Sequence, residues 1–253
     1  MGGAGNDTVD FSGELEGVVL TINMSRVVSG GATEQMFSIE NIVGANYADS
    51  IQGDAGANRL FGGGDNDTIG GGDGANYIRG EDGSDSLVGG SDFDDINGNM
   101  GEDTVSTGAG DDWCVGGRDN DLLRGDDGAD FVYGNLGDDT CDGGTGADTV
   151  RGGQGADSLT GGAGADFLSG DKGDDTLAGG AGADVFHTFS DAGLDRVIDF
   201  SLAEGDRVML DPGTQFTLSQ VGADTVLSMT GGGQIVLVGV SMATLAPGWI
   251  FGA

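Results

Sequence analysis

The chain has 253 residues, with 55 glycines and only 2 prolines, and its 43 acidic and 9 basic residues give a formal charge of −34. The glycine excess without proline excludes a collagen helix and a proline-rich linker, and the acidity argues against nucleic acid or anionic lipid as partners, since phosphates need Lys and Arg. The sole lysine, Lys172, and the sole histidine, His187, argue against a histidine-rich zinc site, a lysine Schiff base and a P-loop.

The chain lacks the usual membrane and export signals. No apolar run approaches the roughly 20 residues that a membrane-spanning helix needs. The first ten residues, MGGAGNDTVD, lack the basic and apolar regions of a cleavable signal peptide. We therefore expect a soluble chain that does not insert into a membrane and carries no conventional export signal.

Residues 1–43 combine one glycine-rich nonapeptide with two strand-like runs. The nonapeptide is GGAGNDTVD at residues 2–10, and the runs are Val18–Met24 and Met36–Val43. The 42 residues that separate Gly2 from Gly44 are not a multiple of nine. We expect this region to be a single repeat followed by a strand-rich insertion or cap.

Residues 44–187 are sixteen consecutive nonapeptides without an insertion or deletion, such as GGTGADTVR at 143–151. Position one is glycine in fifteen units, with Thr107 the exception, and position four is glycine in twelve. Position six is aspartate in fourteen units and asparagine in two, Asn58 and Asn76, while position eight is apolar or cysteine in all sixteen. High charge with few aromatic residues is also typical of disorder, but a disordered chain would not keep one apolar phase across 144 residues.

The pattern predicts a fold from its glycines and its apolar phase. Glycine at positions one and four indicates positive φ angles or close approach of neighbouring turns, and aspartate at position four tolerates the same backbone region. Six-residue loops alternating with three-residue strands give 18 residues per turn, with parallel strands about 4.8 Å apart. The expected fold class is all-β, a right-handed parallel β-roll.

The position-six carboxylates would lie in two files, one along each edge of this roll. Carboxylates at that spacing repel, and hard oxygen ligands suit Ca²⁺ better than zinc or copper. Eight loops per edge leave room for at most about fourteen ions. The candidate ligands are Asp7, Asp49, Asp67, Asp85, Asp94, Asp103, Asp112, Asp121, Asp130, Asp139, Asp148, Asp157, Asp166, Asp175 and Asp184.

A simpler interpretation is that these aspartates are solvated turn residues that cap backbone amides. The strict phase of nine favours calcium, and the two asparagines predict weaker binding near the start of one edge. Each 18-residue turn buries only two position-eight side chains, which is a thin core. Metal binding is therefore expected to be coupled to folding.

These repeats resemble the GGxGxDxUx sequence of the RTX, or haemolysin-type calcium-binding, family. The resemblance implies Ca²⁺ held by the aspartate of one loop, by turn carbonyls and by the next loop on the same edge. It also implies a bacterial extracellular protein that type I secretion machinery exports unfolded and that folds outside in Ca²⁺. The carbonyls so implied are those of Gly116, Gly125, Gly134, Gly143, Gly152, Gly161, Gly170 and Gly179.

Residues 188–253 lose the nonapeptide period. Asp195–Asp211 resembles the segment that closes the roll in serralysin-type C-terminal domains. Alternating runs at Gln215–Val221, Thr225–Met229 and Gln234–Val240 predict an antiparallel β cap. The final residues, VSMATLAPGWIFGA, are uncharged and apolar, which is compatible with a type I secretion signal.

Four other residues invite functional interpretations. Cys114 and Cys141 both occupy position eight, one and a half turns apart, so we expect buried thiols and no disulfide. His187 has no second histidine and no convergent serine or cysteine, so a structural role is expected. Trp113 at position seven should face outward, for surface packing or as a carbohydrate platform.

Three functions follow from these features. The favoured one is a non-enzymatic, secreted calcium-binding protein that acts at a cell surface, in a matrix or in adhesion. The second is the export and folding module of a larger enzyme or toxin, although this chain has neither an HExxH motif nor an apolar pore-forming domain. The third is binding of an extracellular polysaccharide. A carboxylate-based active site is disfavoured because the carboxylates recur in every repeat.

Overall fold

The computed structural model describes residues 6–14, 16–17, 19–21, 27–29, 32–34 and 39–252. These residues form β-strands and one short 3₁₀ helix, Met242–Thr244 (η1), which confirms the all-β prediction. None of the described helices is long and apolar enough to cross a membrane. The chain forms two compact units, Met1–Asp127 and Gly128–Ala253.

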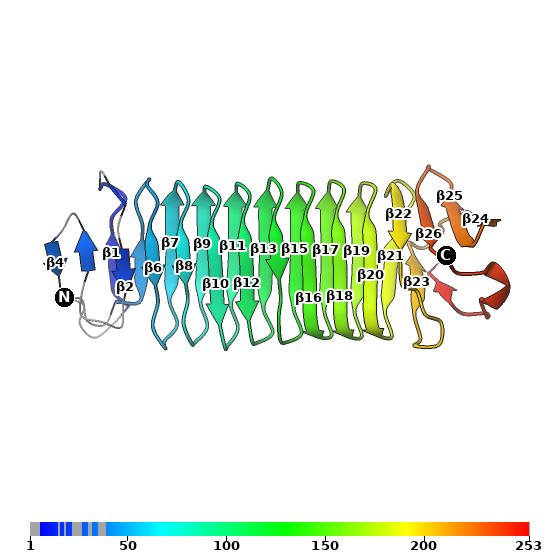
Figure 1. Ribbon diagram of the computed structural model, residues 1–253, viewed down its shortest axis with the longest axis horizontal. Helices are drawn as coiled ribbons and strands as arrows, with labels where there is room; N and C mark the ends of the chain where they lie inside the picture. The colour runs from blue at the N-terminus through cyan, green and yellow to red at the C-terminus, as the bar shows by residue number, and fades with distance from the viewer. Residues whose placement is uncertain are drawn as a thin grey trace. The chain divides into compact units, whose positions relative to one another are not determined.

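The first unit contributes strands to two sheets, which are mostly parallel (Figure 1). One has the order β1 (Thr8–Asp10), β5 (Asn41–Val43), β7 (Arg59–Gly64), β9 (Tyr77–Asp82), β11 (Asp95–Met100), β13 (Trp113–Arg118). The other has the order β4 (Ala32–Glu34), β3 (Val27–Ser29), β2 (Val19–Thr21), β6 (Ser50–Gln52), β8 (Thr68–Gly70), β10 (Ser86–Gly90), β12 (Thr104–Gly108), β14 (Leu122–Arg124). Among the described residues of this unit, the antiparallel pairs are β2–β3 and β3–β4.

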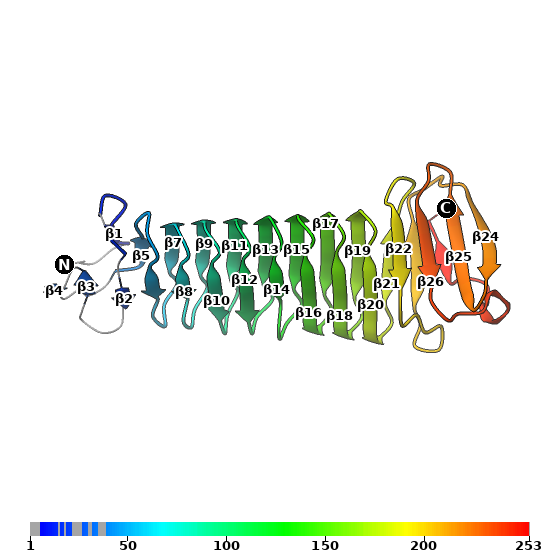
Figure 2. The same cartoon turned by 45° about the horizontal axis from the view of Figure 1, so that its top comes forward.

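The second unit has the same construction. One sheet runs β15 (Phe131–Leu136), β17 (Thr149–Gln154), β19 (Phe167–Lys172), β21 (Val185–Thr188), β23 (Arg207–Leu210), β27 (Ile250–Phe251). The other runs β16 (Thr140–Gly146), β18 (Ser158–Gly164), β20 (Thr176–Gly182), β22 (Leu194–Val197), β26 (Gln234–Leu237), β25 (Asp224–Met229), β24 (Phe216–Val221). Figure 2 shows β24, β25 and β26 side by side, and these three strands pair antiparallel.

The parallel register confirms the predicted turn of 18 residues. In the first unit Leu60 pairs with Ile78, and Ile78 pairs with Ile96. In the second unit Val132 pairs with Val150 in the same way. Each nonapeptide is therefore half a turn of a parallel β-solenoid, and successive strands of one sheet come from alternate repeats.

Many strands are longer than the three residues that the sequence predicts. The strand β9 has six residues, and its last two, Glu81 and Asp82, pair with Gly63 and Gly64 of β7. Glycine at position one points no side chain into the interior, so the backbone ladder continues past it. Hydrogen bonds such as that from the amide of Gly44 to the carbonyl of Phe61, at 2.8 Å, extend the sheet and shorten the loops.

The apolar phase forms the core as predicted. All sixteen position-eight side chains are at most 2% exposed, from Ile51 to Phe186. Cys114 and Cys141 belong to this set, are buried, and form no disulfide, which confirms that interpretation. These two thiols act as small apolar side chains within their respective units.

Positive φ angles occur at position four, as the glycine pattern predicts, and they also occur at position two, where they were not predicted. Position four has positive φ both at glycines such as Gly83 and at the aspartates Asp65 and Asp119, with φ of 66° and 74°. Position two is also left-handed, even at Glu81 and Asn99, with φ of 77° and 79°. The sequence contains a trace of this, because position two is nearly always Gly, Asn, Asp or Glu.

The parallel ladder continues beyond the nonapeptides. Strand β22 pairs with β20 through Arg196 and Thr176, and β23 pairs with β21 through Arg207 and Val185. The offsets are 20 and 22 residues instead of 18, because the connecting loops absorb the additional residues. The predicted antiparallel cap is therefore limited to β24, β25 and β26, and β26 also pairs parallel with β22.

The predicted N-terminal strands are only partly within the described residues. Strand β2 falls inside the run Val18–Met24 and strand β5 inside Met36–Val43. The rest of the first run, residues 36–38 of the second, and residues 2–5 of the first nonapeptide lie outside the described residues.

Candidate metal centre

Position-six carboxylates line up one turn apart in each unit. The amide of Asp49 donates to Oδ1 of Asp67 at 2.7 Å, and the amide of Asp67 donates to Oδ1 of Asp85 at 2.8 Å. In the second unit the amide of Asp139 donates to Oδ1 of Asp157 at 2.8 Å. The other file repeats this bond between Asn76, Asp94 and Asp112 in the first unit and between Asp130, Asp148, Asp166 and Asp184 in the second.

The same residues are buried. Every predicted aspartate from Asp49 to Asp184 is at most 4% exposed, so these side chains are not the solvated turn residues of the simpler interpretation. Their Oδ1 atoms do cap amides, but the amide belongs to the preceding turn. One carboxylate oxygen thus has a structural role in holding two turns together.

The second carboxylate oxygen, Oδ2, lacks a hydrogen-bond partner in nine of these buried residues, namely Asp67, Asp85, Asp94, Asp103, Asp148, Asp157, Asp166, Asp175 and Asp184. A buried charged oxygen without a partner is costly unless a cation or a proton compensates it. The first repeats differ, because backbone amides reach this atom: Ala45 donates to Oδ2 of Asp49 at 2.6 Å.

Each orphaned Oδ2 lies against the position-one glycine of its own repeat, and we call this place the loop cradle. A Cβ placed on Gly143 would lie 2.7 Å from Oδ2 of Asp148 and 2.6 Å from the carbonyl oxygen of Gly161. A Cβ on Gly161 would lie 2.6 Å from both Oδ2 of Asp166 and the carbonyl of Gly179. These distances are too short for a Cβ, so only glycine fits here, and the same close packing places a carboxylate oxygen of one turn near a carbonyl oxygen of the next, as a pair of the hard oxygen donors that calcium prefers.

Three of the eight predicted carbonyl oxygens lie at a loop cradle. The carbonyls of Gly152, Gly161 and Gly179 border a loop cradle, while Gly116, Gly134, Gly143 and Gly170 form the cradle floor beside an aspartate. Within the described residues no group of three or more His, Cys, Asp or Glu side chains forms a metal cluster. The oxygen donors at a cradle are accordingly one carboxylate plus backbone carbonyls.

Burial changes the acidity of these groups. Loss of solvent raises the pKa of Asp67, Asp103 and Asp157 to about 7. The same cause raises the pKa of Asp85 and Asp166 to about 6. Without a cation, the fold therefore favours the protonated acids, and at neutral pH a cation would remove this penalty.

One loop cradle is filled by protein. Thr107 replaces the position-one glycine, and its hydroxyl donates to the carbonyl of Gly125 at 2.7 Å. The pKa of the nearby Asp112 carboxyl is raised by burial, and the Thr107 hydroxyl beside it acts in the opposite direction. The side chain occupies the space between carboxylate and carbonyl that is open in the glycine repeats.

Asp7 differs from the other predicted ligands. Its side chain is half-buried, and its amide donates to Oε2 of Glu40 at 2.8 Å. Glu40 lies 18 residues before Asn58 and takes the place of a position-six residue. Sequence reasoning missed Glu40 because the repeat that contains it has no glycines.

Two further aspartates extend the files in the second unit. The amide of Asp184 donates to Oδ1 of Asp206 at 3.1 Å, and Asp195 takes the corresponding place one turn after Asp175, whose carbonyl accepts the amide of Arg196 at 2.8 Å. Sequence reasoning also missed these two, because loops of irregular length shift them out of the period of nine. The signal was the triplet Asp-Arg-Val at 195–197 and 206–208, which keeps the aspartate-to-apolar spacing of the repeats.

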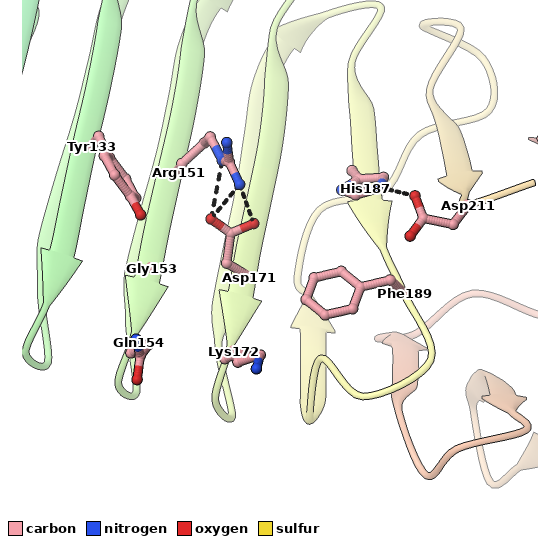
Figure 3. A pocket seen from close by; sticks show the side chains of 9 residues that line it. All are labelled: Tyr133, Arg151, Gly153, Gln154, Asp171, Lys172, His187, Phe189 and Asp211. Atoms are coloured by element: carbon pink, nitrogen blue, oxygen red, sulfur yellow. Dashed lines mark hydrogen bonds and ion pairs between the residues drawn. The ribbon is translucent and has the colours of Figure 1, made fainter.

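A pocket of about 410 Å³ lies on the outer face of the second unit (Figure 3). There His187 contacts Oγ of Ser169 through Nδ1 and Oδ1 of Asp211 through Nε2, both at 3.2 Å. The expectation that no serine converges on His187 is wrong, because the 18-residue register places Ser169 beside it. Ser169 is 1% exposed and donates its only proton to Asp171 at 2.8 Å, so it is not a free nucleophile.

The comparisons with known proteins agree with this geometry. A family model, the RTX calcium-binding nonapeptide repeat, matches in four copies at residues 43–78, 79–114, 115–150 and 151–186. The chain belongs to the RTX calcium-binding repeat family. A search of curated protein sequences found no match.

Two solved structures are among those similar to this RTX chain. The AlgE6R3 subunit of the Azotobacter vinelandii mannuronan C5-epimerase has 27% identity and a TM-score of 0.37, over 54% of this chain and 79% of that one. The extracellular lipase LipA of Serratia marcescens has 21% identity and a TM-score of 0.39, over 77% of this chain and 40% of that one.

Proposed function

We propose that this chain is a secreted RTX β-roll protein that folds when it binds Ca²⁺ outside the cell and has no catalytic activity of its own. The observation that supports this most strongly is the row of buried Oδ2 atoms without hydrogen-bond partners, several of which lie beside a backbone carbonyl oxygen at a loop cradle. Bound calcium would supply positive charge to compensate these carboxylates and would link successive loops. Cell-surface, matrix or adhesion roles remain the favoured settings.

The residues proposed to hold calcium are those whose oxygens lie at the loop cradles. Position-six aspartates from Asp67 to Asp184 would present Oδ2, and position-one carbonyls one turn on would complete the contact. Asn58 and Asn76 remove a charge, and Thr107 fills its cradle, so we propose fewer ions than the fourteen that repeat counting allows. Asp7 is not among the buried ligands that support the proposal.

RTX repeats are linked to substrates of type I secretion, and the proposed folding switch suits that route. In a calcium-poor cytosol the uncompensated carboxylates would disfavour the roll and keep the chain unfolded for export. Outside, calcium would offset their burial and fold the chain. The difference in calcium concentration between the two compartments would then decide in which of them the chain folds.

A Ca²⁺ titration of EDTA-treated protein tests this proposal, with far-UV circular dichroism as the readout and Mg²⁺ as the control ion. We expect a cooperative transition to β-structure with Ca²⁺ and none with Mg²⁺, because Mg²⁺ demands smaller octahedral sites and dehydrates reluctantly. A spectrum that is already rich in β-structure in EDTA contradicts the folding switch.

The same switch would serve as the export and folding module of a larger secreted enzyme or toxin. Sequencing upstream of this reading frame distinguishes that role, because a contiguous catalytic or pore-forming domain would establish it. The folding behaviour proposed for the present residues is the same in either case.

A second candidate function is saccharide binding at the pocket of Figure 3. Its charged groups are already paired: Arg151 bonds Asp171 through Nε at 3.0 Å and Nη2 at 2.8 Å, and His187 faces Asp211. Paired charges with the ring of Tyr133 alongside favour a neutral, hydroxyl-rich ring as ligand.

Titration calorimetry with neutral oligosaccharides in saturating Ca²⁺ tests the pocket. We expect Tyr133→Ala to abolish binding and Trp113→Ala, which lies in the other unit, to leave it unchanged. Binding that depends on Trp113 instead would place the platform elsewhere, and the absence of any heat would reject saccharide binding.

A further inference from the structure

The outermost strand of the cap in the second unit, β24, has one unpaired edge. It pairs antiparallel with β25 along its whole length, with Phe216 opposite Met229 and Val221 opposite Asp224, and it ends the sheet on that side. Figure 2 shows β24 as the last strand of the cap. Among the described residues no backbone hydrogen bond joins β24 to any strand other than β25, so the amides and carbonyls on its outer side lack backbone partners.

This edge lacks the features that usually protect an edge strand, which are charged side chains, proline, a β-bulge or a very short strand. The sequence of β24, FTLSQV, has no charge and no proline, and its register with β25 is continuous. At the edge of the other sheet in this unit, β27 has two residues and is protected by its shortness. A flat edge of six residues is therefore a template for pairing with another strand.

The apolar face of the cap is incomplete at this edge. Leu218 lies directly opposite Leu227, and directly opposed residues of an antiparallel pair share one face of the sheet. Leu227 is 1% exposed, whereas Leu218 is 37% exposed. The buried face of the cap thus stops at β25, and a further strand beside β24 would cover the side chain of Leu218.

The charge of this region favours a second copy of the chain as the partner. In residues 212–253 the only charged residue is Asp224, and its carboxylate already accepts the amide of Gly239 at 2.8 Å. The whole chain has 43 acidic and 9 basic residues, so two copies repel each other over most of their surface. They meet the least repulsion at the uncharged edge of β24, where a basic partner would find no acidic residue to pair with.

We propose that two copies of this chain form a dimer by antiparallel pairing of their β24 strands about a two-fold axis. Since opposed residues share a face, Leu218 lies opposite the partner's Leu218, and Phe216 lies opposite the partner's Gln220. The pairing uses the free edge of both copies, so the assembly closes at two chains. One strand gives a small interface, and dimerisation is therefore expected to depend on protein concentration.

Sedimentation equilibrium in saturating Ca²⁺ tests the dimer with the wild type, with Leu218→Glu and with the matched control Ile198→Glu. Ile198 is 50% exposed and follows β22, an interior strand of the sheet. We expect the wild type and Ile198→Glu to approach twice the mass of one chain as concentration rises. Leu218→Glu should remain monomeric, because it places two like charges opposite each other. Circular dichroism checks that each variant has folded.

Three results of this experiment would overturn the proposal. The first is a wild type that stays monomeric at about 1 mM, where even a millimolar dissociation constant gives visible dimer. The second is assembly beyond two copies. The third is equal dimerisation of the wild type and a folded Leu218→Glu protein, which would place the interface elsewhere.

A charge-swapped pair tests the two-fold register. Leu218→Lys alone should be monomeric, like Leu218→Glu. An equimolar mixture of the two variants should recover the dimer, since opposite charges then face each other across the axis. A mixture of folded variants that stays monomeric overturns the pairing of Leu218 with the partner's Leu218.

A second measurement uses the wild type alone and so does not depend on the folding of a variant. Raising NaCl from about 0.05 M to about 0.5 M should tighten the dimer, because salt screens the repulsion between two acidic chains. A dimer that weakens with salt would have an interface of paired charges, which overturns pairing through the uncharged β24 edge.

Discussion

The loops of Asp85 and Asp112 in the first unit share a backbone and differ in what fills the cradle. At Asp85 the cradle lies above Gly80 and borders the carbonyl of Gly98, which a Cβ on Gly80 would approach to 2.8 Å. At Asp112 the hydroxyl of Thr107 takes that space. Both carboxylates are buried, and the Oδ1 atoms of both accept an amide from the preceding turn.

This difference teaches that the two oxygens of one aspartate have separable tasks. Oδ1 holds the turns together and needs only an acceptor, which an asparagine also supplies, as Asn76 does for the amide of Asn58 at 3.0 Å. Oδ2 is needed only where the cradle is open. The predictions below test this division of tasks.

The largest expected effect is removal of metal at neutral pH, and acid should partly reverse it. Asp67, Asp103 and Asp157 have a pKa raised to about 7 by burial, from a usual value of 3.8. Because folding raises the pKa of these carboxyls, their contribution to the stability of the fold is fully present below a pH of about 3.8. This contribution is lost as the pH rises through about 7. Circular dichroism in EDTA should therefore show more β-structure at pH 5 than at pH 7.5.

With Ca²⁺ present the pH dependence should reverse, because protons compete with calcium for Oδ2. The apparent calcium affinity is expected to fall between pH 7.5 and pH 5. A metal-free chain that is equally unfolded at both pH values would contradict the link between buried carboxylates and folding.

The next effect in size separates the two oxygens at Asp148. Asp148→Ala removes both oxygens, including the Oδ1 that accepts the buried amide of Asp130, whereas Asp148→Asn keeps Oδ1. We expect both variants to weaken calcium binding and to lower the cooperativity of folding. In saturating Ca²⁺, urea unfolding should show the alanine variant to be less stable than the asparagine variant by about 1–3 kcal/mol. Equal stability would mean that Oδ1 has no structural role.

A smaller effect is expected from opening the filled cradle. Thr107→Gly should let one additional Ca²⁺ bind, counted by calorimetry against the wild type. In EDTA the same variant should be no more stable than the wild type, since glycine adds chain entropy to the unfolded state. The reverse change at a regular loop, Gly80→Thr, is the matched control and should remove one ion.

The smallest effect should come from restoring a carboxylate at Asn76. Its Nδ2 donates to the carbonyl of Gly74 at 2.7 Å, so a nitrogen lies where other repeats present an oxygen. Asn76→Asp should tighten calcium binding at one loop by about tenfold, which corresponds to about 1.4 kcal/mol. Unchanged affinity in a calcium titration would indicate that this loop holds no ion in either form.

Much of the fold could be predicted from the repeats, because each of the nine positions has one structural role. The apolar position eight predicted the core from Ile51 to Phe186, and the aspartates predicted two files, in each of which successive members lie one turn apart. Strand length was not predictable, since backbone hydrogen bonds through position one leave no trace in side-chain pattern. His187 and Ser169 are neighbours for a related reason, as the register of β19 and β21 is set by the whole turn.

The sequence by itself determined the period, the buried phase and the charge that has to be compensated, because these depend only on residue type and spacing. Tertiary structure decided which carboxylate oxygen is left without a partner, that Thr107 fills its cradle, and that Asp195 lies one turn beyond Asp175 although the turn is two residues longer. Those outcomes depend on how stacked backbones approach one another, and the stacking brings together atoms that are 18 to 22 residues apart in the chain.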